Sequence, residues 1–103
     1  MHIAFASVAA TDESKKLASL ATEMGNEIYD VGLPDSKWAG TGSAVGAAIS
    51  SGRFKIGIAM CWTGHGVAIA SNRYRGIRAA FCVSARQAKE AREWHDSNVL
   101  ALS

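Results

Sequence analysis

Residues 56–72, which read IGIAMCWTGHGVAIASN, decide the fold that the rest of the chain must complete. The apolar run Ile56-Gly57-Ile58-Ala59-Met60 predicts a buried strand, and the small residues 67–72 predict the opening of a helix. Residues 61–66 place a thiol, a hydroxyl and two glycines at the junction between them. In an open α/β sheet, ligands usually bind at the carboxyl end of a strand, where the chain continues into a helix. The free N–H groups of the helix start can hold an oxyanion or a phosphate there.

The segments on both sides of this stretch continue the same alternation of strand and helix. Apolar or alternating runs predict five strands, at 3–6, 27–31, 55–59, 77–82 and 99–102. Helical spacing and caps predict four helices: from Thr11 or Asp12 to Met24, from about Gly42 to Ser51, from Val67 to between Arg73 and Gly76, and from Ser84 to about His95. A turn-rich loop at 32–36 surrounds the only proline. The alternation predicts one α/β domain over residues 1–103, with a mainly parallel five-stranded sheet and helices on both faces.

The composition is that of a small globular protein. Hydrophobic residues make up 49% of the 103 residues and charged residues 19%, which argues against disorder. The net charge of +2 comes from scattered basic residues, so neither nucleic acid nor a membrane is an expected partner, and a small anionic ligand fits the mild basicity. With no signal peptide in the sequence, Cys61 and Cys82 are expected to be reduced thiols in a cytoplasmic protein. A chain of this size has a thin stability margin, which a dimer would improve.

The loop after the third strand carries the strongest candidate for chemistry. Cys61 is either a general base or nucleophile, activated by the nearby helix start, or a buried cysteine at the end of a strand. Thr63, Gly64 and Gly66 either supply a hydroxyl and backbone donors to a developing oxyanion or form a plain glycine-rich turn. The loop lacks both the G-x-G-x-x-G dinucleotide fingerprint and the lysine of a Walker A loop.

The histidines admit several interpretations. His65 is a candidate acid or ligand, and Cys61, His65 and His95 together suggest zinc. They do not form a closed ligand set, so no metal is expected. His95 and Asp96 are either an acid–base pair or a solvated helix end.

Arginines and tryptophans give weaker signals. Arg75 and Arg78 either bind an anion or form surface salt bridges. Trp38, Trp62 and Trp94 lie near the predicted strand ends, where they either pack in the core or an interface, or stack on a sugar ring. In the last predicted helix, the residues that lie on one stripe are Ala85, Ala88, Ala91 and Trp94.

The order of these motifs resembles a known family. Residues 57–73, GIAMCWTGHGVAIASNR, resemble the segment G-I-L-I-C-G-T-G-x-G-x-x-I-A-A-N-K of the ribose-5-phosphate isomerase B / galactose-6-phosphate isomerase (RpiB/LacAB) family. Residues 76–80, GIRAA, match that family's G-I-R-A-A, and residues 96–102, DSNVLAL, are similar to its N-D-A-N-V-L-A-L. The first half of the chain agrees in layout, with an I-A-F strand, a D-V-G strand end and a small-residue helix.

The resemblance implies a three-layer Rossmann-like fold and a homodimer whose active sites are shared between subunits. It implies aldose–ketose isomerisation of a small sugar or sugar phosphate through a cis-enediolate, without a metal or other cofactor. By position, Cys61 matches the base and Thr63 the hydroxyl beside it, while Gly64 and Gly66 match the oxyanion loop. Two further residues match family positions near the site, namely Asn72 and Arg78.

The departures from the family pattern concern the groups that handle the sugar. Val8 and Ala9 stand where the family has Asp-His, which contacts sugar hydroxyls and phosphate. The family's Tyr segment is replaced near residues 37–39, and its His-Asn, whose His assists ring opening, reads Trp94-His95. Trp62 replaces the first glycine of the loop. The sequence stops at Ser103, whereas the family continues into a C-terminal helix that contributes phosphate-binding arginines.

Two functions follow from this pattern. One is an isomerase on an altered substrate, with Cys61, Thr63 and His95 as catalytic residues and His65 as an alternative acid. In this function, the substrate-binding residues are Trp62, Gly64, His65, Gly66, Asn72 and Arg78. The other is a catalytically degenerate subunit that binds a partner or a small ligand, as the loss of the Asp-His pair suggests.

Overall fold

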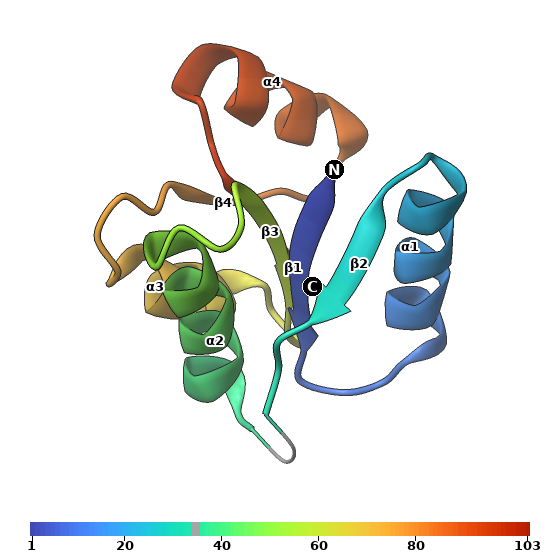
Figure 1. Cartoon of the computed structure of the whole chain (residues 1–103), viewed down its shortest axis with the longest axis horizontal. Helices are drawn as coiled ribbons and strands as arrows, with labels where there is room; N and C mark the ends of the chain where they lie inside the picture. The colour runs from blue at the N-terminus through green and yellow to red at the C-terminus, as the bar shows by residue number, and fades with distance from the viewer. Residues whose placement is uncertain (34–35) are drawn as a thin grey trace.

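The computed structural model describes residues 1–33 and 36–103 and shows a five-stranded parallel sheet between helices (Figure 1). The strands are β1 (His2–Ser7), β2 (Glu27–Asp30), β3 (Ile56–Met60), β4 (Ala79–Phe81) and β5 (Val99–Leu102). The helices are α1 (Asp12–Glu23), α2 (Trp38–Ser50), α3 (His65–Asn72) and α4 (Ala85–His95). Part of the predicted turn-rich loop, residues 34–35, lies outside the described residues.

The sheet has the strand order β2-β1-β3-β5-β4, with β3 at its centre, and all four strand pairs are parallel. Helices α2 and α3 cover one face and α1 lies on the other (Figure 1). Apolar clusters fill both layers. The cluster on the α2–α3 side includes Val45, Val67 and Ala101, and the one on the α1 side includes Phe5 and Met60. The predicted α/β fold with a parallel five-stranded sheet is therefore confirmed.

The central strands form because their residues are apolar on both faces. In β1, residues 3–6 are all buried, and in β3 the same holds for residues 57–60. Such continuous apolar runs are typical of parallel strands covered on both faces. The end of β3 is therefore held rigidly at the centre of the sheet, and the residues that follow it inherit that fixed position.

Helices α2 and α3 lie close together because glycines line their contact. A Cβ atom at Gly42 would lie 2.6 Å from the Val67 carbonyl oxygen and 2.7 Å from the Ala70 Cβ. The Ser71 hydroxyl donates a hydrogen bond to the Gly42 carbonyl at 2.9 Å, so the polar group buried in this contact is satisfied. The small residues that weaken helix propensity in α2 thus serve its packing on α3.

Two helices begin earlier than the sequence predicts. Helix α2 begins at Trp38 rather than near Gly42, although its N-cap residue, Lys37, makes no side-chain capping bond. Tertiary packing compensates, because the Trp38 ring lies against Gly66. Helix α3 begins at His65 rather than Val67, since Gly64 adopts a left-handed conformation (φ +76°) that turns the chain directly into the helix.

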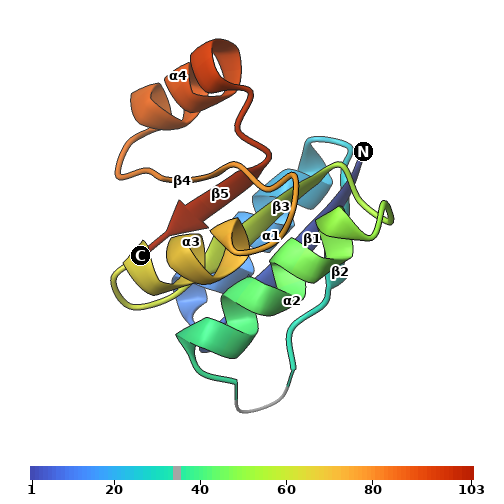
Figure 2. The ribbon, with the colours of Figure 1, turned by 90° about the vertical axis from the view of Figure 1, so that its left-hand side faces the viewer.

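Helix α4 has no buried face. It begins after the expected Ser84 cap, whose hydroxyl accepts a bond from the Gln87 N–H, but none of its residues is buried. Trp94, expected on the stripe, is 70% exposed. In Figure 2, α4 stands at the end of the molecule beyond β4 and β5. In the described part of the chain, no helix is both long and apolar enough to span a membrane.

Candidate active site

The candidate site lies at the carboxyl edge of the sheet, where residues 61–66 connect β3 to α3. Two neighbouring strand ends hold the start of this loop. The Cys61 N–H donates to the Leu102 carbonyl oxygen at 3.0 Å, and the Val8 N–H donates to the Met60 carbonyl oxygen at 3.0 Å. The predicted junction between strand and helix is therefore fixed by the strands on both sides of β3.

Cys61 is nearly buried, with 9% of its surface exposed. Its Sγ accepts a hydrogen bond from the Gly64 N–H at 3.1 Å and lies 3.9 Å from the Thr63 hydroxyl. Burial by itself raises the pKa of the Cys61 thiol, but the backbone N–H groups of Val67, Thr63 and Gly64 and the Thr63 hydroxyl outweigh it. The net result is a pKa below the ordinary value for cysteine, which favours the thiolate.

Gly64 is required at the turn for two reasons. Its φ of +76° is rarely adopted by residues with a side chain, and a Cβ atom there would collide with the Phe81 ring. The turn also orders its neighbours, because the His65 N–H donates to the Thr63 hydroxyl oxygen at 3.3 Å. The His65 ring packs against Phe81 at 4.4 Å between ring centroids. His65 therefore rests on β4 and lines neither of the cavities at Cys61.

Two adjoining cavities open at Cys61, and both are lined by Val8, Cys61 and Trp62. The first, of about 340 Å³, lies toward the loop between β1 and α1. Its other lining residues are Ser7, Ala9, Thr11, Glu13, Met60 and Ser103. The second, of about 420 Å³, lies toward the start of α2, and its other lining residues are Ser36, Lys37, Trp38, Thr63 and Gly66. Trp62, 75% exposed, stands between them.

The remaining predicted site residues lie at the opposite, amino edge of the sheet. Arg78 immediately precedes β4, and His95 ends α4 just before β5. Asn72 ends α3. Its side-chain amide accepts a hydrogen bond from the Ala79 N–H at 2.8 Å and donates one to the Ala79 carbonyl oxygen at 3.1 Å. The structure thus brings together the predicted residues 61–66 but places Asn72, Arg78 and His95 apart from them within one chain.

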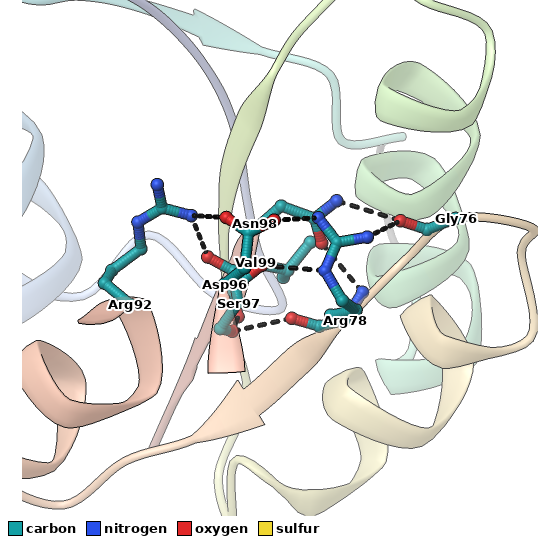
Figure 3. A network of polar contacts seen from close by, with 7 residues as sticks. All are labelled: Gly76, Arg78, Arg92, Asp96, Ser97, Asn98 and Val99. Atoms are coloured by element: carbon teal, nitrogen blue, oxygen red, sulfur yellow. Dashed lines mark hydrogen bonds and ion pairs between the residues drawn. The ribbon is translucent and has the colours of Figure 1, made fainter. Parts of the chain in front are cut away.

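Arg78 belongs to a polar network that joins β4 to β5 (Figure 3). Its Nε donates to the Asp96 carbonyl oxygen at 2.7 Å, and its two terminal nitrogens bond the Gly76 carbonyl oxygen and the Asp96 carboxylate. Asn98 completes the network by accepting from the Arg78 N–H and donating to the same Gly76 oxygen. All three guanidinium nitrogens therefore have acceptors within their own chain.

Glu13 and Lys37 supply the charged side chains that line the cavities, and neither was predicted as a site residue, although the family resemblance places residues 37–39 at the Tyr segment. Glu13 looks like a favourable acidic residue in the first turn of α1, and Lys37 looks like part of a loop. Both follow strands that run parallel to β3, and the carboxyl ends of parallel strands meet at one edge. That rule is the signal in the sequence that could have placed both residues beside Cys61. Elsewhere, no three His, Cys, Asp or Glu side chains of residues 1–33 and 36–103 gather as a metal site.

Comparisons with known proteins agree with this arrangement. The family model described as Ribose/Galactose Isomerase matches residues 3–103. Ribose-5-phosphate isomerase B of Escherichia coli is 38% identical over 83 residues, which cover 78% of this chain and 56% of that protein. The chain therefore spans about half the length of this curated relative.

Two solved structures have the same fold. That of Clostridium thermocellum ribose-5-phosphate isomerase B has a TM-score of 0.90 at 34% identity, and the match covers 100% of this chain and 72% of that one. Ribose-5-phosphate isomerase B of Mycoplasma genitalium, solved with bound ribulose-5-phosphate, has a TM-score of 0.87 at 28% identity, covering 99% and 71% of the two chains.

Proposed function

Because the chain belongs to the ribose/galactose isomerase family, we propose that it interconverts an aldose and a ketose by proton transfer at Cys61. The observation that carries this proposal is the nearly buried Cys61 thiol, held by the Gly64 N–H at 3.1 Å beside two open cavities. A thiol whose pKa is lowered by surrounding donors is suited to remove a proton from carbon next to a carbonyl group.

In this mechanism, the Cys61 thiolate removes the proton from C2 of the aldose, and the electron pair moves toward the carbonyl oxygen. The N–H groups at the start of α3 stabilise the resulting enediolate, with Gly66 lining the cavity in which that oxygen lies. Thr63 positions both the thiol and the turn through its hydroxyl. Cys61 then returns the proton to C1, which gives the ketose without a net change in protons.

The transfer of a proton between the two substrate oxygens needs a second group. His95 and Arg78 lie at the opposite edge of the sheet from Cys61, so they reach a site only from another copy of the chain. The proposal therefore includes a homodimer in which His95 of one subunit serves as the acid at Cys61 of the other. Asn72 supports that contact region through its bonds to Ala79 at the start of β4, and Arg78 through its bonds to Asp96 and Asn98 before β5.

The test is an isomerisation assay in deuterium oxide. The panel contains tetroses, pentoses and hexoses, each as the free sugar and as its terminal phosphate. We expect one of them to be isomerised with uptake of solvent deuterium at the carbon that receives the proton. Cys61→Ala should abolish both product and deuterium uptake, with a loss of at least about 10³-fold in rate.

Cys82→Ala is the matched control, because Cys82 is the other buried thiol and lines neither cavity at Cys61. It should keep the activity. Full turnover by Cys61→Ala would contradict the mechanism. Binding of a panel sugar without isomerisation or deuterium uptake would instead favour a family member that binds without catalysis.

A further inference from the structure

The position of His95 is not set by the packing of its own helix. None of the residues of α4 is buried, and both Trp94 and His95 at its end are exposed. In Figure 2, the helix stands beyond β4 and β5. A helix that buries no face takes little support from tertiary packing. The orientation of His95 therefore depends on the turn that follows it, residues 96–98.

The second half of that turn is bound to the segment just before β4. Ser97 and Asn98 are only 6% and 8% exposed. The Ser97 hydroxyl donates to the Arg78 carbonyl oxygen at 2.6 Å. The Asn98 side chain accepts from the Arg78 N–H at 2.7 Å and donates to the Gly76 carbonyl oxygen at 2.9 Å. Because these buried polar groups are satisfied by several fixed partners, the end of the turn nearest the sheet is rigid.

Asp96 joins this rigid end to His95 through a strained backbone. Its φ of +50° is left-handed, and in the described part of the chain it is the one residue other than glycine with a positive φ. Such a conformation persists where neighbouring groups hold it. Arg78 does so, since its Nε donates to the Asp96 carbonyl oxygen at 2.7 Å (Figure 3). The direction in which the chain leaves α4 is therefore fixed at Asp96.

The Asp96 carboxylate is shared by two arginines from different elements (Figure 3). One oxygen accepts from a terminal nitrogen of Arg78 at 3.3 Å, and the other accepts from Arg92 at 3.5 Å. Arg92 lies in the last turn of α4 and also bonds the Ser97 carbonyl oxygen, whereas Arg78 immediately precedes β4. The carboxylate thus connects the end of the helix to the sheet. Since both ion pairs are exposed, they add little global stability, and their effect is local.

We propose that Asp96 is a positioning residue that fixes His95 at the end of α4, and that Arg78 acts through Asp96 rather than on the substrate. The Arg78 guanidinium is engaged for this purpose, because all three of its nitrogens bond acceptors in their own chain. The inference rests on the proposed function for the chemical role of His95, which is that of an acid presented to a second copy of the chain. The placement of His95 itself is measured without a substrate.

Backbone ¹⁵N relaxation of the full chain measures that placement. Asp96→Asn keeps a residue that tolerates the left-handed conformation, but the single oxygen of its amide replaces a carboxylate that serves two arginines. We expect the order parameter of the His95 amide to fall from about 0.85, the value for rigid backbone, toward about 0.6. Arg78→Gln should have the same effect. An unchanged order parameter at His95 in either variant would overturn the inference.

Arg86→Gln is the matched control. It removes an ion pair of the same kind, to Glu90 at 3.0 Å, from the first turn of the same helix. It should leave the order parameter of His95 unchanged. A fall equal to that in Asp96→Asn would mean that the loss of any charge on α4 loosens its end, which would overturn the role of Asp96.

The kinetic test uses the panel sugar that the wild-type chain isomerises. Asp96→Asn should lower kcat at least about tenfold and change KM by less than about twofold, because a displaced acid weakens the transition state rather than binding. Arg78→Gln should do the same, and Arg78→Lys, which keeps a single bond to Asp96, should recover part of the loss. A raised KM in Arg78→Gln but not in Asp96→Asn would show that Arg78 binds the substrate itself, and would overturn the inference.

The two proposals fail in different ways. If Asp96→Asn and Arg78→Gln loosen His95 but no panel sugar takes up deuterium, the proposed function fails while the placement of His95 by Asp96 stands. If a panel sugar is isomerised with the same kcat by the wild type and by Asp96→Asn, this inference fails while the proposed function stands.

Discussion

The ionisation of Cys61 is set by two opposing effects at a single residue. Burial raises the pKa of its thiol, and the N–H groups of Val67, Thr63 and Gly64 with the Thr63 hydroxyl lower it by more. At a given pH, Cys61 therefore holds more thiolate than an ordinary cysteine. Cys82 has burial alone, which raises the pKa of its thiol.

The pH dependence of alkylation by iodoacetamide measures this difference between the two thiol pKa values, since only the thiolate reacts. The rate at Cys61 should reach half of its maximum at a lower pH than the rate at an ordinary cysteine, because the pKa of the Cys61 thiol is lowered. Thr63→Val removes one of the groups that lower the pKa, so it should move that midpoint upward. Mass spectrometry of the labelled peptides separates Cys61 from Cys82, and a midpoint for Cys61 at or above that of Cys82 would contradict the prediction.

Gly64 offers a second test at the scale of a residue. Gly64→Ala should lower the free energy of unfolding by about 2 kcal/mol or more, because it combines left-handed strain with a collision against Phe81. Gly25→Ala is the matched control: its φ is +92° but nothing lies within 4 Å of the added Cβ. It should cost only about 1–2 kcal/mol. Urea unfolding measures both, and equal costs would show that the Phe81 contact is not responsible.

Of the residues at the site, the sequence predicts those that are neighbours along the chain. Residues 61–66 are found because they follow a buried strand directly. Glu13 and Lys37 follow other strands, so only the spatial order of the strands brings them to Cys61. The acceptors that occupy the Arg78 guanidinium come from two separate loops, and no local pattern indicates them.

At the scale of elements, the contact between α2 and α3 depends on the absence of side chains. Gly42→Ala should destabilise the protein by about 1–3 kcal/mol, because the new methyl group would press on the Val67 carbonyl and on Ala70. Gly40→Ala, in the first turn of the same helix, meets only the Ser36 side chain, at 3.0 Å or more. That variant should be neutral or stabilise by up to about 1 kcal/mol through helix propensity. Thermal unfolding of both variants decides, and similar midpoints would argue against close packing at Gly42.

The element boundaries show which parts of the fold local sequence patterns predict and which parts they miss. Strands β1 and β3 are predicted well, because a long apolar run has few alternatives to a buried parallel strand. The start of α2 is missed, because the glycines of its sequence lower the helix propensity that the packing of Trp38 on Gly66 restores. The stripe predicted for α4 has no buried residue, because spacing indicates a face of a helix but not whether anything covers it.

At the scale of the whole molecule, the proposed shared site predicts complementation between subunits. Cys61→Ala and His95→Ala homodimers should each be inactive. If the groups act across the interface, a mixed dimer contains one site with both lesions and one intact site. Co-expressed chains with different affinity tags, purified as the mixed dimer, should then recover about half of the wild-type activity. A mixed dimer without activity would show that both residues serve the same chain, and a monomer in sedimentation analysis would exclude the arrangement.

The exposure of α4 has a consequence for how the molecule opens. This helix is held by its cap and by exposed ion pairs along its own surface, Arg86–Glu90, Lys89–Glu93 and Arg92–Asp96, which contribute little stability. Its amide hydrogens should therefore exchange with solvent through local openings, long before those of β1 and β3. Exchange followed by mass spectrometry measures this order, and equal protection of α4 and β3 would mean that another surface covers α4. The last parts of the molecule to open are then β1 and β3, the second of which leads directly into Cys61.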